Sequence, residues 1–336
     1  MRRSILVLIL IAALIPQAIA KKWTVDSNPG NNADFATLQA AHDGAADGDT
    51  LYVRGSGTSY GILVLTKKLI IFGPGYFLTE NPNTQANGTT ASTGTITFAT
   101  GSDGSLFTGF TVKANVVIRI SNVIFKRNFV DLEGSGAAGV IVGISASNVT
   151  IAQNYIITTT TGNTNASLVL GGSNSIVTNN YIECTSPCRV IGKQTPIVTS
   201  SSNIQNNVIF GNVNIVNADF KNNILIAGTY FSPSTTTTNN IGNGTQFDTA
   251  DGNQENVTMT TVFDGTGSTD GQWQLAVSSP AIGAGIGGID VGMYGGTDPY
   301  VLSGIPHIPN IYQFDGPTTG STTAGLPITL KVKSNN

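Results

Sequence analysis

The chain has 336 residues, a length typical of two domains or of one large repetitive or barrel-like domain. Charged residues make up 10% of it, against roughly 25% in an average globular protein, while hydrophobic residues make up 40%. Disordered chains show the opposite balance, so this composition excludes wholesale disorder. The 16 basic and 19 acidic residues give a net charge of −3 and form no basic block, so nucleic acid is not an expected partner.

Residues 1–20 have the three-part layout of a secretory signal peptide. Two arginines stand near the start, an apolar run follows from Ile5 to Ile15, and residues 18–20 (Ala-Ile-Ala) form a cleavage site of the small-x-small type. The apolar run is too short to span a bilayer comfortably, which argues against a membrane anchor. We therefore expect cleavage after Ala20, a secreted or cell-surface protein, and no transmembrane segment in the mature chain.

The chain has two cysteines, Cys184 and Cys188, with a proline between them. In the oxidising compartment that export implies, two nearby cysteines most simply form one disulfide, worth only about 2 kcal/mol for so short a loop on the chain-entropy model. The alternatives are a redox pair or half of a metal site. A metal site needs further ligands, and the two histidines, His42 and His307, lie far away in the sequence. We predict a structural disulfide, and neither a metal nor a cofactor.

The central region contains an internal repeat, in which an asparagine is followed by two apolar residues. The asparagines are spaced by 26, 26, 27 and 16 residues, and Asn240 extends the series by 17 more. Apolar residues recur three positions before and two positions after each asparagine. The aligned asparagines are Asn128, Asn154, Asn180, Asn207 and Asn223.

These units predict short strands and tight turns, because β-branched runs alternate with Gly, Asn, Ser and Thr. Residues that recur once per unit can stack ~4.8 Å apart in the successive coils of a solenoid. Apolar columns would fill the interior, and the asparagine column would occupy a turn. Asparagine tolerates left-handed backbone geometry there, and its amide can bond the amide of the next coil. We predict that residues 95–245 form stacked coils, with the differences in unit length placed in loops.

Three further segments carry the resemblance to a known fold. Residues 33–53 (ADFATLQAAHDGAADGDTLYV) read as a helix, a Gly-Asp turn and a strand, residues 68–76 (KLIIFGPGY) read as an early coil, and residues 275–296 contain LAVSSPAIGAG and DVGMYGG. With the repeat, they resemble exported bacterial right-handed parallel β-helix proteins of the pectate-lyase-like superfamily. The resemblance covers roughly residues 23–305 and implies a fold rather than a reaction, because the superfamily includes lyases, hydrolases, adhesins and structural proteins.

The expected fold is therefore all-β, a single-stranded right-handed parallel β-helix with a short N-terminal capping helix. Phe35, Leu38 and Ala41 lie at helical spacing behind Asp34, a candidate cap, and such a helix would cover the open end of the solenoid. The expected divisions are 21–304 for the β-helix domain, 21–60 for its cap and first coil, 255–304 for its closing segment, and 305–336 for a Pro/Gly/Thr-rich linker with a short strand.

Few residues in the repeat region offer catalytic chemistry. The resemblance implies that polysaccharide lyases and hydrolases of this fold carry acidic calcium ligands or a tight group of Asp, and residues 95–245 show neither pattern. Asp131 and Glu183 each stand three residues after a ladder asparagine, in coils separated by one other, which places them roughly 9–10 Å apart. That distance is at the upper edge for inverting glycosidases. The alternative interpretation is a pair of solvated loop carboxylates.

The shortage of acids and bases favours a non-catalytic solenoid that binds glycans or other surfaces. The alternative is a polysaccharide lyase or glycoside hydrolase that works in a groove along the solenoid. Lys126 and Arg127, beside Asp131, would then belong either to a sugar-binding cluster or to an exposed, ion-paired surface. A polysaccharide or a cell-surface glycan is the expected partner.

Overall fold

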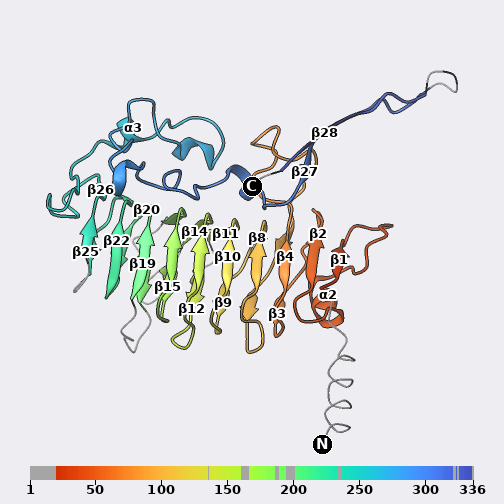
Figure 1. Ribbon diagram of the computed structural model, residues 1–336, viewed down its shortest axis with the longest axis horizontal. Coiled ribbons are helices and arrows are strands. Elements are labelled where there is room, and N and C mark those ends of the chain that lie inside the picture. Colours follow the sequence, from red (N-terminus) through yellow and green to blue (C-terminus); the bar gives the residue numbers. More distant parts are fainter. Residues whose placement is uncertain are drawn as a thin grey trace, which may run out of the picture.

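The computed structural model describes residues 20–134, 136–159, 166–185, 189–193, 201–232, 236–320, 323 and 325–334. Within these ranges the chain winds into a parallel β-helix whose coils stack along one axis (Figure 1). Each complete coil adds one strand to each of three parallel sheets, so the all-β solenoid expected from the repeat is confirmed. Residues 1–19 lie outside the described ranges, so the signal peptide stays a prediction. Among the described helices, none is both long and apolar enough to cross a membrane.

The strands of the solenoid fall into three sheets, named here in the order in which a coil passes through them. The ten-stranded sheet contains β1 (Lys22–Val25), β2 (Thr50–Val53), β4 (Ile70–Phe72), β7 (Leu106–Thr108), β10 (Ile124–Lys126), β13 (Thr150–Ala152), β16 (Ile176–Thr178), β19 (Ser202–Gln205), β22 (Ala218–Lys221) and β25 (Thr236–Thr238). The second sheet contains β5 (Ser92–Thr93), β8 (Thr111–Val112), β11 (Phe129–Leu132), β14 (Tyr155–Thr158), β17 (Tyr181–Cys184), β20 (Val208–Phe210), β23 (Ile224–Ile226) and β26 (Ile241–Gly242). The third sheet contains β3 (Leu63–Leu65), β6 (Ile96–Phe98), β9 (Val116–Ile118), β12 (Val140–Val142), β15 (Ala166–Leu170), β18 (Arg189–Lys193), β21 (Asn212–Asn214) and β24 (Tyr230–Phe231).

The core consists of apolar columns that run along the solenoid axis. One column joins Phe125, Ile151, Val177, Ile204 and Phe220, which are direct partners in the ten-stranded sheet and are all 0% exposed. Because successive side chains of a strand point to opposite faces, the middle residue of each short strand enters the core while its neighbours face outward. The apolar residue three positions before each ladder asparagine is therefore the one that sets the register.

The asparagine ladder lies at the turn between the ten-stranded and second sheets. Asn154 shows the shared pattern. Its Nδ2 donates to Asn180 Oδ1 (3.0 Å) and to the Phe125 carbonyl (2.9 Å), and its backbone N–H also donates to Asn180 Oδ1 (2.8 Å). The backbone and amide contacts to the next asparagine recur along a buried column, whose members are Asn128, Asn154, Asn180, Asn207, Asn223, Asn240 and Asn253. The predicted ladder is confirmed, and Asn253 is a member that the sequence did not reveal.

Left-handed backbone geometry, which we expected at the ladder asparagines, belongs instead to the residue before each of them. The six residues that precede Asn128 to Asn240 in the ladder have φ between 54° and 56°, and Gly252, which precedes Asn253, has φ of 78°. In a two-residue corner, the first residue makes the left-handed bend, and the ladder asparagine then places its amide in the interior. We call the six bending residues other than Gly252 the outer column; they are Arg127, Gln153, Asn179, Asn206, Asn222 and Asn239.

The capping helix exists, but it begins later than the sequence predicted. Helix α2 spans Leu38–Gly44, and the Thr37 side chain accepts a hydrogen bond from the Ala40 N–H (3.2 Å) as its N-cap. Asp34 accepts hydrogen bonds from the backbone and hydroxyl of Thr24 instead (both 2.8 Å), which ties it to β1 and leaves it outside the helix. The helix packs near β1 and β3 at the N-terminal end of the solenoid (Figure 1).

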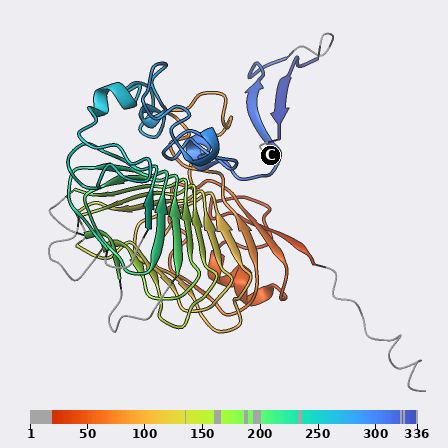
Figure 2. The ribbon, with the colours of Figure 1, turned by 60° about the vertical axis from the view of Figure 1, so that its left-hand side comes forward.

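Residues 257–306, which we call the strap, run back along the outside of the solenoid (Figures 1 and 2). The strap contains α3 (Met259–Val262) and the short 3-10 turns η1 (Gly271–Trp273), η2 (Ile286–Gly288) and η3 (Leu302–Gly304). The outer column binds the strap in reverse order, because residues later in the outer column contact residues earlier in the strap. Asn239 donates to the Ala284 carbonyl (2.7 Å) near the C-terminal coil, and Arg127 donates to the Ile305 carbonyl (2.6 Å) much nearer the N-terminal end.

The strap also covers an aromatic surface of the second sheet. Tyr155 and Tyr181 stack at the start of adjacent strands with ring centroids 4.3 Å apart. Trp273 of the strap packs on Tyr181 (4.7 Å between centroids) and donates its indole N–H to the Tyr155 hydroxyl (3.1 Å). Burial raises the pKa of both tyrosines well above the ordinary value. The strap, which contains the expected closing motifs, therefore packs against the side of the coils.

The far end of the strap is fixed by a fully buried carboxylate. Asp270 is 0% exposed and accepts hydrogen bonds from Asn81 Nδ2 (2.9 Å), the Ser303 N–H (2.7 Å) and the Tyr300 hydroxyl (3.1 Å). A buried carboxylate is tolerated only when such donors satisfy it. Asp270 therefore joins two parts of the strap to the loop around Asn81.

After the strap the chain forms an antiparallel hairpin of β27 (Asn310–Asp315) and β28 (Thr329–Lys333). The sequence predicted one strand here, from the alternation of Ile328, Leu330 and Val332. The second strand comes from residues 310–315, which carry no comparable alternation. The hairpin projects from the body of the solenoid (Figures 1 and 2).

Candidate functional site

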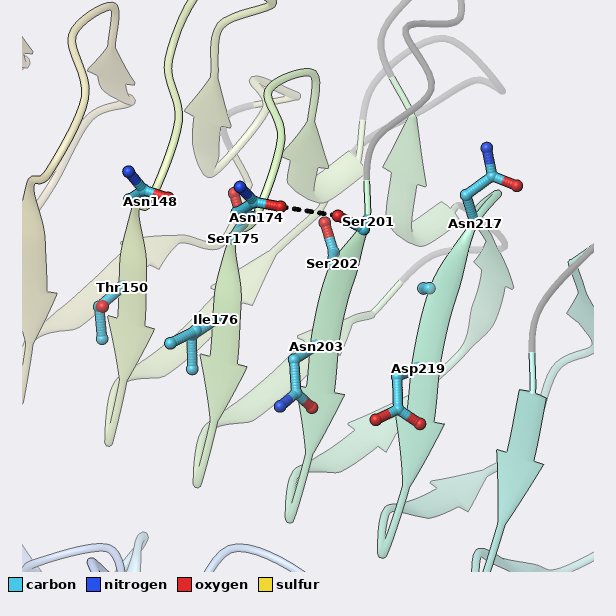
Figure 3. Close-up of a pocket in the computed structure, with 11 residues that line it drawn as sticks. Asn148, Thr150, Asn174, Ser175, Ile176, Ser201, Ser202, Asn203, Asn217 and Asp219 are labelled. Atoms are coloured by element: carbon cyan, nitrogen blue, oxygen red, sulfur yellow. Dashed lines mark hydrogen bonds between the residues drawn. The ribbon is translucent and has the colours of Figure 1, made fainter.

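A groove of about 740 Å³ lies along the outer side of the ten-stranded sheet (Figure 3). Four neighbouring strands, β13, β16, β19 and β22, supply it. Its volume falls within the range of ordinary ligand sites, about 300–1,000 Å³. Its lining comes from equivalent positions of successive coils and comprises Asn148, Thr150, Asn174, Ser175, Ile176, Ser201, Ser202, Asn203, Asn217, Ala218 and Asp219.

One row of the groove stands at the corner where each coil enters the ten-stranded sheet. Asn148, Asn174 and Asn217 adopt left-handed backbone geometry there, with φ of 55°, 55° and 50°. Asparagine suits this position because its short polar side chain lowers the cost of left-handed geometry. The Ser201 hydroxyl donates to Asn174 Oδ1 (2.7 Å), as Figure 3 shows, and Asn148 Nδ2 donates to Asn122 Oδ1 (3.3 Å). The corner thus presents a line of amide and hydroxyl groups.

A second row runs across the face of the sheet. It consists of the register partners Thr150, Ile176, Asn203 and Asp219, one from each strand. Ile176 is 41% exposed and provides an apolar contact between polar neighbours. Since adjacent strands are ~4.8 Å apart, the two rows repeat their hydrogen-bonding groups along the axis at that interval.

Asn203 Oδ1 in this second row is buried and lacks a hydrogen-bond partner among the described residues. Ser175 Oγ and Ser202 Oγ lack one as well, but they belong to the inward-facing column that contains the core residues Val149 and Ala218. Buried polar groups in native proteins are nearly always hydrogen-bonded, and leaving one unpaired costs about 1–3 kcal/mol. Of the three, Asn203 Oδ1 belongs to the outward-facing row, so the groove is where water or a ligand can complete its hydrogen bonding.

The groove carries little charge. Among the described residues that line it, Asp219 is the only carboxylate, and Lys221, two residues along the same strand, pairs with it. The lining therefore provides hydroxyl and amide groups, one neutralised carboxylate and an exposed isoleucine. Such a surface suits a neutral, hydroxyl-rich ligand better than an ion.

A second groove, of about 340 Å³, lies at the N-terminal end of the same sheet. Tyr52 and Phe72 stack within it, with centroids 5.6 Å apart, and Arg54 stands beside them. Its polar groups already have partners: Arg54 pairs with Asp26 (3.7 Å), and Asn87 accepts from a neighbouring backbone N–H. This contrast makes the first groove the stronger candidate site.

The structure places Asp131 and Glu183 on the outer side of the second sheet, away from the candidate groove. Both pair with Ile157, from opposite sides, so one strand separates them as the repeat predicted. Asp131 forms an ion pair with Lys113, and Glu183 accepts a hydrogen bond from the Tyr181 hydroxyl (2.6 Å). Each carboxylate thus has a local partner, and Ile157 lies between them. Their catalytic role stays a prediction.

Lys126 and Arg127 form neither a sugar-binding cluster nor a shared exposed surface. Lys126 forms an ion pair with Asp298 of the strap (2.6 Å). Arg127 is only 2% exposed, and its guanidinium donates to Gln153 Oε1 (2.5 Å) as well as to the strap. Burial lowers the pKa of Arg127 to about 10, so it stays charged at neutral pH. Both residues hold the strap.

Cys184 ends strand β17 and is 4% exposed, whereas Cys188 lies outside the described residues. The disulfide between them therefore stays a prediction. Within the part of the chain that the structure describes, no group of three His, Cys, Asp or Glu residues is placed to hold a metal ion.

The fold defines the chain as a parallel β-helix with an internal asparagine ladder. Comparisons with known proteins found no matching family model, no similar curated protein and no similar solved structure. The groove is therefore the feature of the molecule that indicates a function.

Proposed function

We propose that the protein binds a neutral polysaccharide, without cleaving it, in the groove on the ten-stranded sheet. The observation that carries this proposal is the row of neutral amide and hydroxyl groups along four coils, which includes the unpartnered Asn203 Oδ1. Amide and hydroxyl groups both donate and accept hydrogen bonds, so sugar hydroxyls complement Asn174, Ser201 and Asn203. A bound ligand would give Asn203 Oδ1 the partner that it lacks.

The shape of the groove supports a polymer rather than a compact ligand. Its two rows repeat from coil to coil at ~4.8 Å, so a ligand lying along the solenoid axis would contact equivalent positions of successive coils. The exposed Ile176 side chain offers an apolar surface for the carbon face of a sugar ring. Successive sugars would then make equivalent contacts.

The composition of the lining supports binding rather than hydrolysis. Glycoside hydrolysis generally uses two carboxyl groups, one on either side of the scissile bond. Asp219 is the single carboxylate in the part of the groove lining that the structure describes, and Lys221 neutralises it. A neutral lining also favours an uncharged glycan over an acidic one.

Export and superfamily membership belong to the same proposal. The apolar run of residues 5–15 and the small residues before position 21 support a cleaved signal peptide. The stacked parallel strands, the capping helix and the asparagine ladder support a place in the right-handed, pectate-lyase-like superfamily. A secreted or cell-surface solenoid would meet polysaccharides directly.

Titration of the mature protein with neutral and acidic polysaccharides, followed by calorimetry, tests the proposal. The diagnostic variant is Asn203→Val, which removes the amide at the centre of the groove and keeps a side chain suited to a strand. The matched control is Thr97→Val, which makes a polar-to-apolar change in β6 of the third sheet. We expect a neutral glycan to bind, and binding to weaken about tenfold or more in Asn203→Val but not in Thr97→Val. Equal binding by both variants, or release of reducing ends during the titration, would contradict the proposal.

A further inference from the structure

The hairpin of β27 and β28 has one continuous apolar face. Ile311 lies opposite Val332, and Phe314 lies opposite Leu330. Residues directly opposite one another in an antiparallel pair point to the same side, and so do residues two apart in a strand. Ile311, Phe314, Leu330 and Val332 therefore share a face, while Lys331 belongs to the other face.

This apolar face is open to solvent. The four side chains are between 43% and 60% exposed, and the alternation continues through Ile328 (54%) and Leu326 (48%). Isolated exposed hydrophobic residues are ordinary, but a contiguous apolar patch indicates an interaction surface. A two-stranded hairpin alone is also only marginally stable in water. Both observations indicate that another surface covers this face.

The base of the hairpin is fixed to the body of the solenoid. The Ala86 N–H donates to the Ile311 carbonyl (2.8 Å), and Lys333 Nζ donates to the Asn83 carbonyl (2.7 Å). A groove of about 550 Å³ lies beside this anchor, lined by residues that include Ile308, Pro309, Ile311 and Phe314. The apolar face thus continues from the hairpin onto the body.

We propose that this face is a homodimer interface, in which the hairpins of two copies of the chain pack face to face. The area argues for a second copy. Six half-exposed apolar side chains offer on the order of 600 Å² per chain, so pairing about a two-fold axis would bury about 1,200 Å², the lower limit for a specific interface. The face is uniformly apolar, so it is complementary to itself, as a two-fold contact requires. Two packed hairpins also form a four-stranded sandwich, which removes the weakness of a lone hairpin.

Sedimentation equilibrium of the mature protein over a wide concentration range tests the proposal. We expect a reversible monomer–dimer equilibrium. The double variant Phe314→Ser/Leu330→Ser should weaken association about tenfold or more, and Ile282→Ser, which changes a 50% exposed isoleucine of the strap, should leave it unchanged.

A wild-type protein that stays monomeric at every concentration would overturn the proposal, whatever the variants do. A dimer that both variants preserve equally would overturn the hairpin as the interface. Flotation with neutral phosphatidylcholine vesicles distinguishes the other occupant: a monomer that floats with the vesicles would assign the face to a lipid surface instead. Glycan binding is measured separately, so its failure leaves the dimer unaffected.

Discussion

Replacing Asn180 with alanine tests the asparagine ladder at its best-connected position. The Asn180 side-chain oxygen accepts from both the backbone N–H and the amide of Asn154 (2.8 and 3.0 Å). Its amide nitrogen donates to the Ile151 carbonyl (2.9 Å), the Thr178 carbonyl (3.0 Å) and Asn207 Oδ1 (2.9 Å). Alanine removes all five contacts at a site that is 0% exposed.

The expected loss follows from the groups left behind. The Asn154 N–H loses its acceptor, and the Ile151 carbonyl loses a donor, in an interior where each unpaired group costs about 1–3 kcal/mol. Asn207 Oδ1 keeps its contact with the Asn180 backbone N–H (3.0 Å), so it is not orphaned. We therefore expect the free energy of unfolding to fall by about 2–5 kcal/mol.

Chemical denaturation followed by circular dichroism measures this loss, and Asn87→Ala is the control. Asn87 is exposed and accepts one local hydrogen bond from the Thr89 N–H, so its replacement should cost no more than about 0.5 kcal/mol. If Asn180→Ala and Asn87→Ala destabilise the protein equally, the hydrogen bonds of the ladder do not stabilise the fold.

Three further predictions concern the strap, the N-terminal end and the cysteines. Asn179→Ala removes the donors to the Met293 and Gly295 carbonyls (2.9 and 2.7 Å), so limited proteolysis should cut the strap faster than in wild type while the coils persist; unchanged cutting would contradict the role of the outer column. Although burial opposes it, hydrogen bonds from Lys21, Trp23 and Ala46 lower the pKa of Asp49 below 3.8. The stability that Asp49 contributes is therefore complete above about pH 4 and lost as the pH falls through its folded-state pKa. Denaturation followed by tryptophan fluorescence, to which Trp23 and Trp273 contribute, should show this acid dependence, and Asp49→Asn should flatten it. Mass spectrometry of protein from an oxidising compartment should find Cys184 and Cys188 joined, and two free thiols there would refute the disulfide.

The ladder could be predicted from the sequence because the same residue type returns once in every coil. Asn154 and Asn180 are 26 residues apart, each with an apolar residue three positions before it, and that pairing of a polar and an apolar column fixes the register. Asn253 could not be predicted in this way because it follows Asn240 after only 13 residues, in a segment with no matching strand pattern. Sequence periodicity identifies positions that recur at a regular spacing, and Asn253 does not.

The strap and its contacts could not be predicted in the same way. The outer column contains arginine, glutamine and asparagine, so its members cannot be recognised by residue type. They share only the left-handed backbone geometry. Its partners, such as Ile305 for Arg127, lie up to 178 residues away and follow no spacing rule. For the same reason, we predicted that Lys126 and Arg127 lie on the surface. Nothing in the neighbouring sequence shows that the strap covers them.

The groove could be predicted only in part. Asn148, Asn174 and Asn217 recur in the sequence six positions before ladder asparagines, and Ser201 occupies the same column, so this row of the groove could be predicted. The unpartnered Oδ1 of Asn203 depends on side-chain packing between coils, which the spacing does not determine. Asp131 and Glu183, the carboxylates that the sequence indicated as candidates, lie on a different sheet.

Hydrogen exchange, measured by mass spectrometry with and without a saturating neutral glycan, tests the central claim most directly. Binding in the groove should slow exchange in β16, β19 and β22 and in the corners that precede them. The outer side of the second sheet, around Asp131 and Glu183, should exchange at the same rate in both states. Protection centred on Asp131 and Glu183, or the absence of protection at Ser202 and Asn203 when a glycan is bound, would contradict the account.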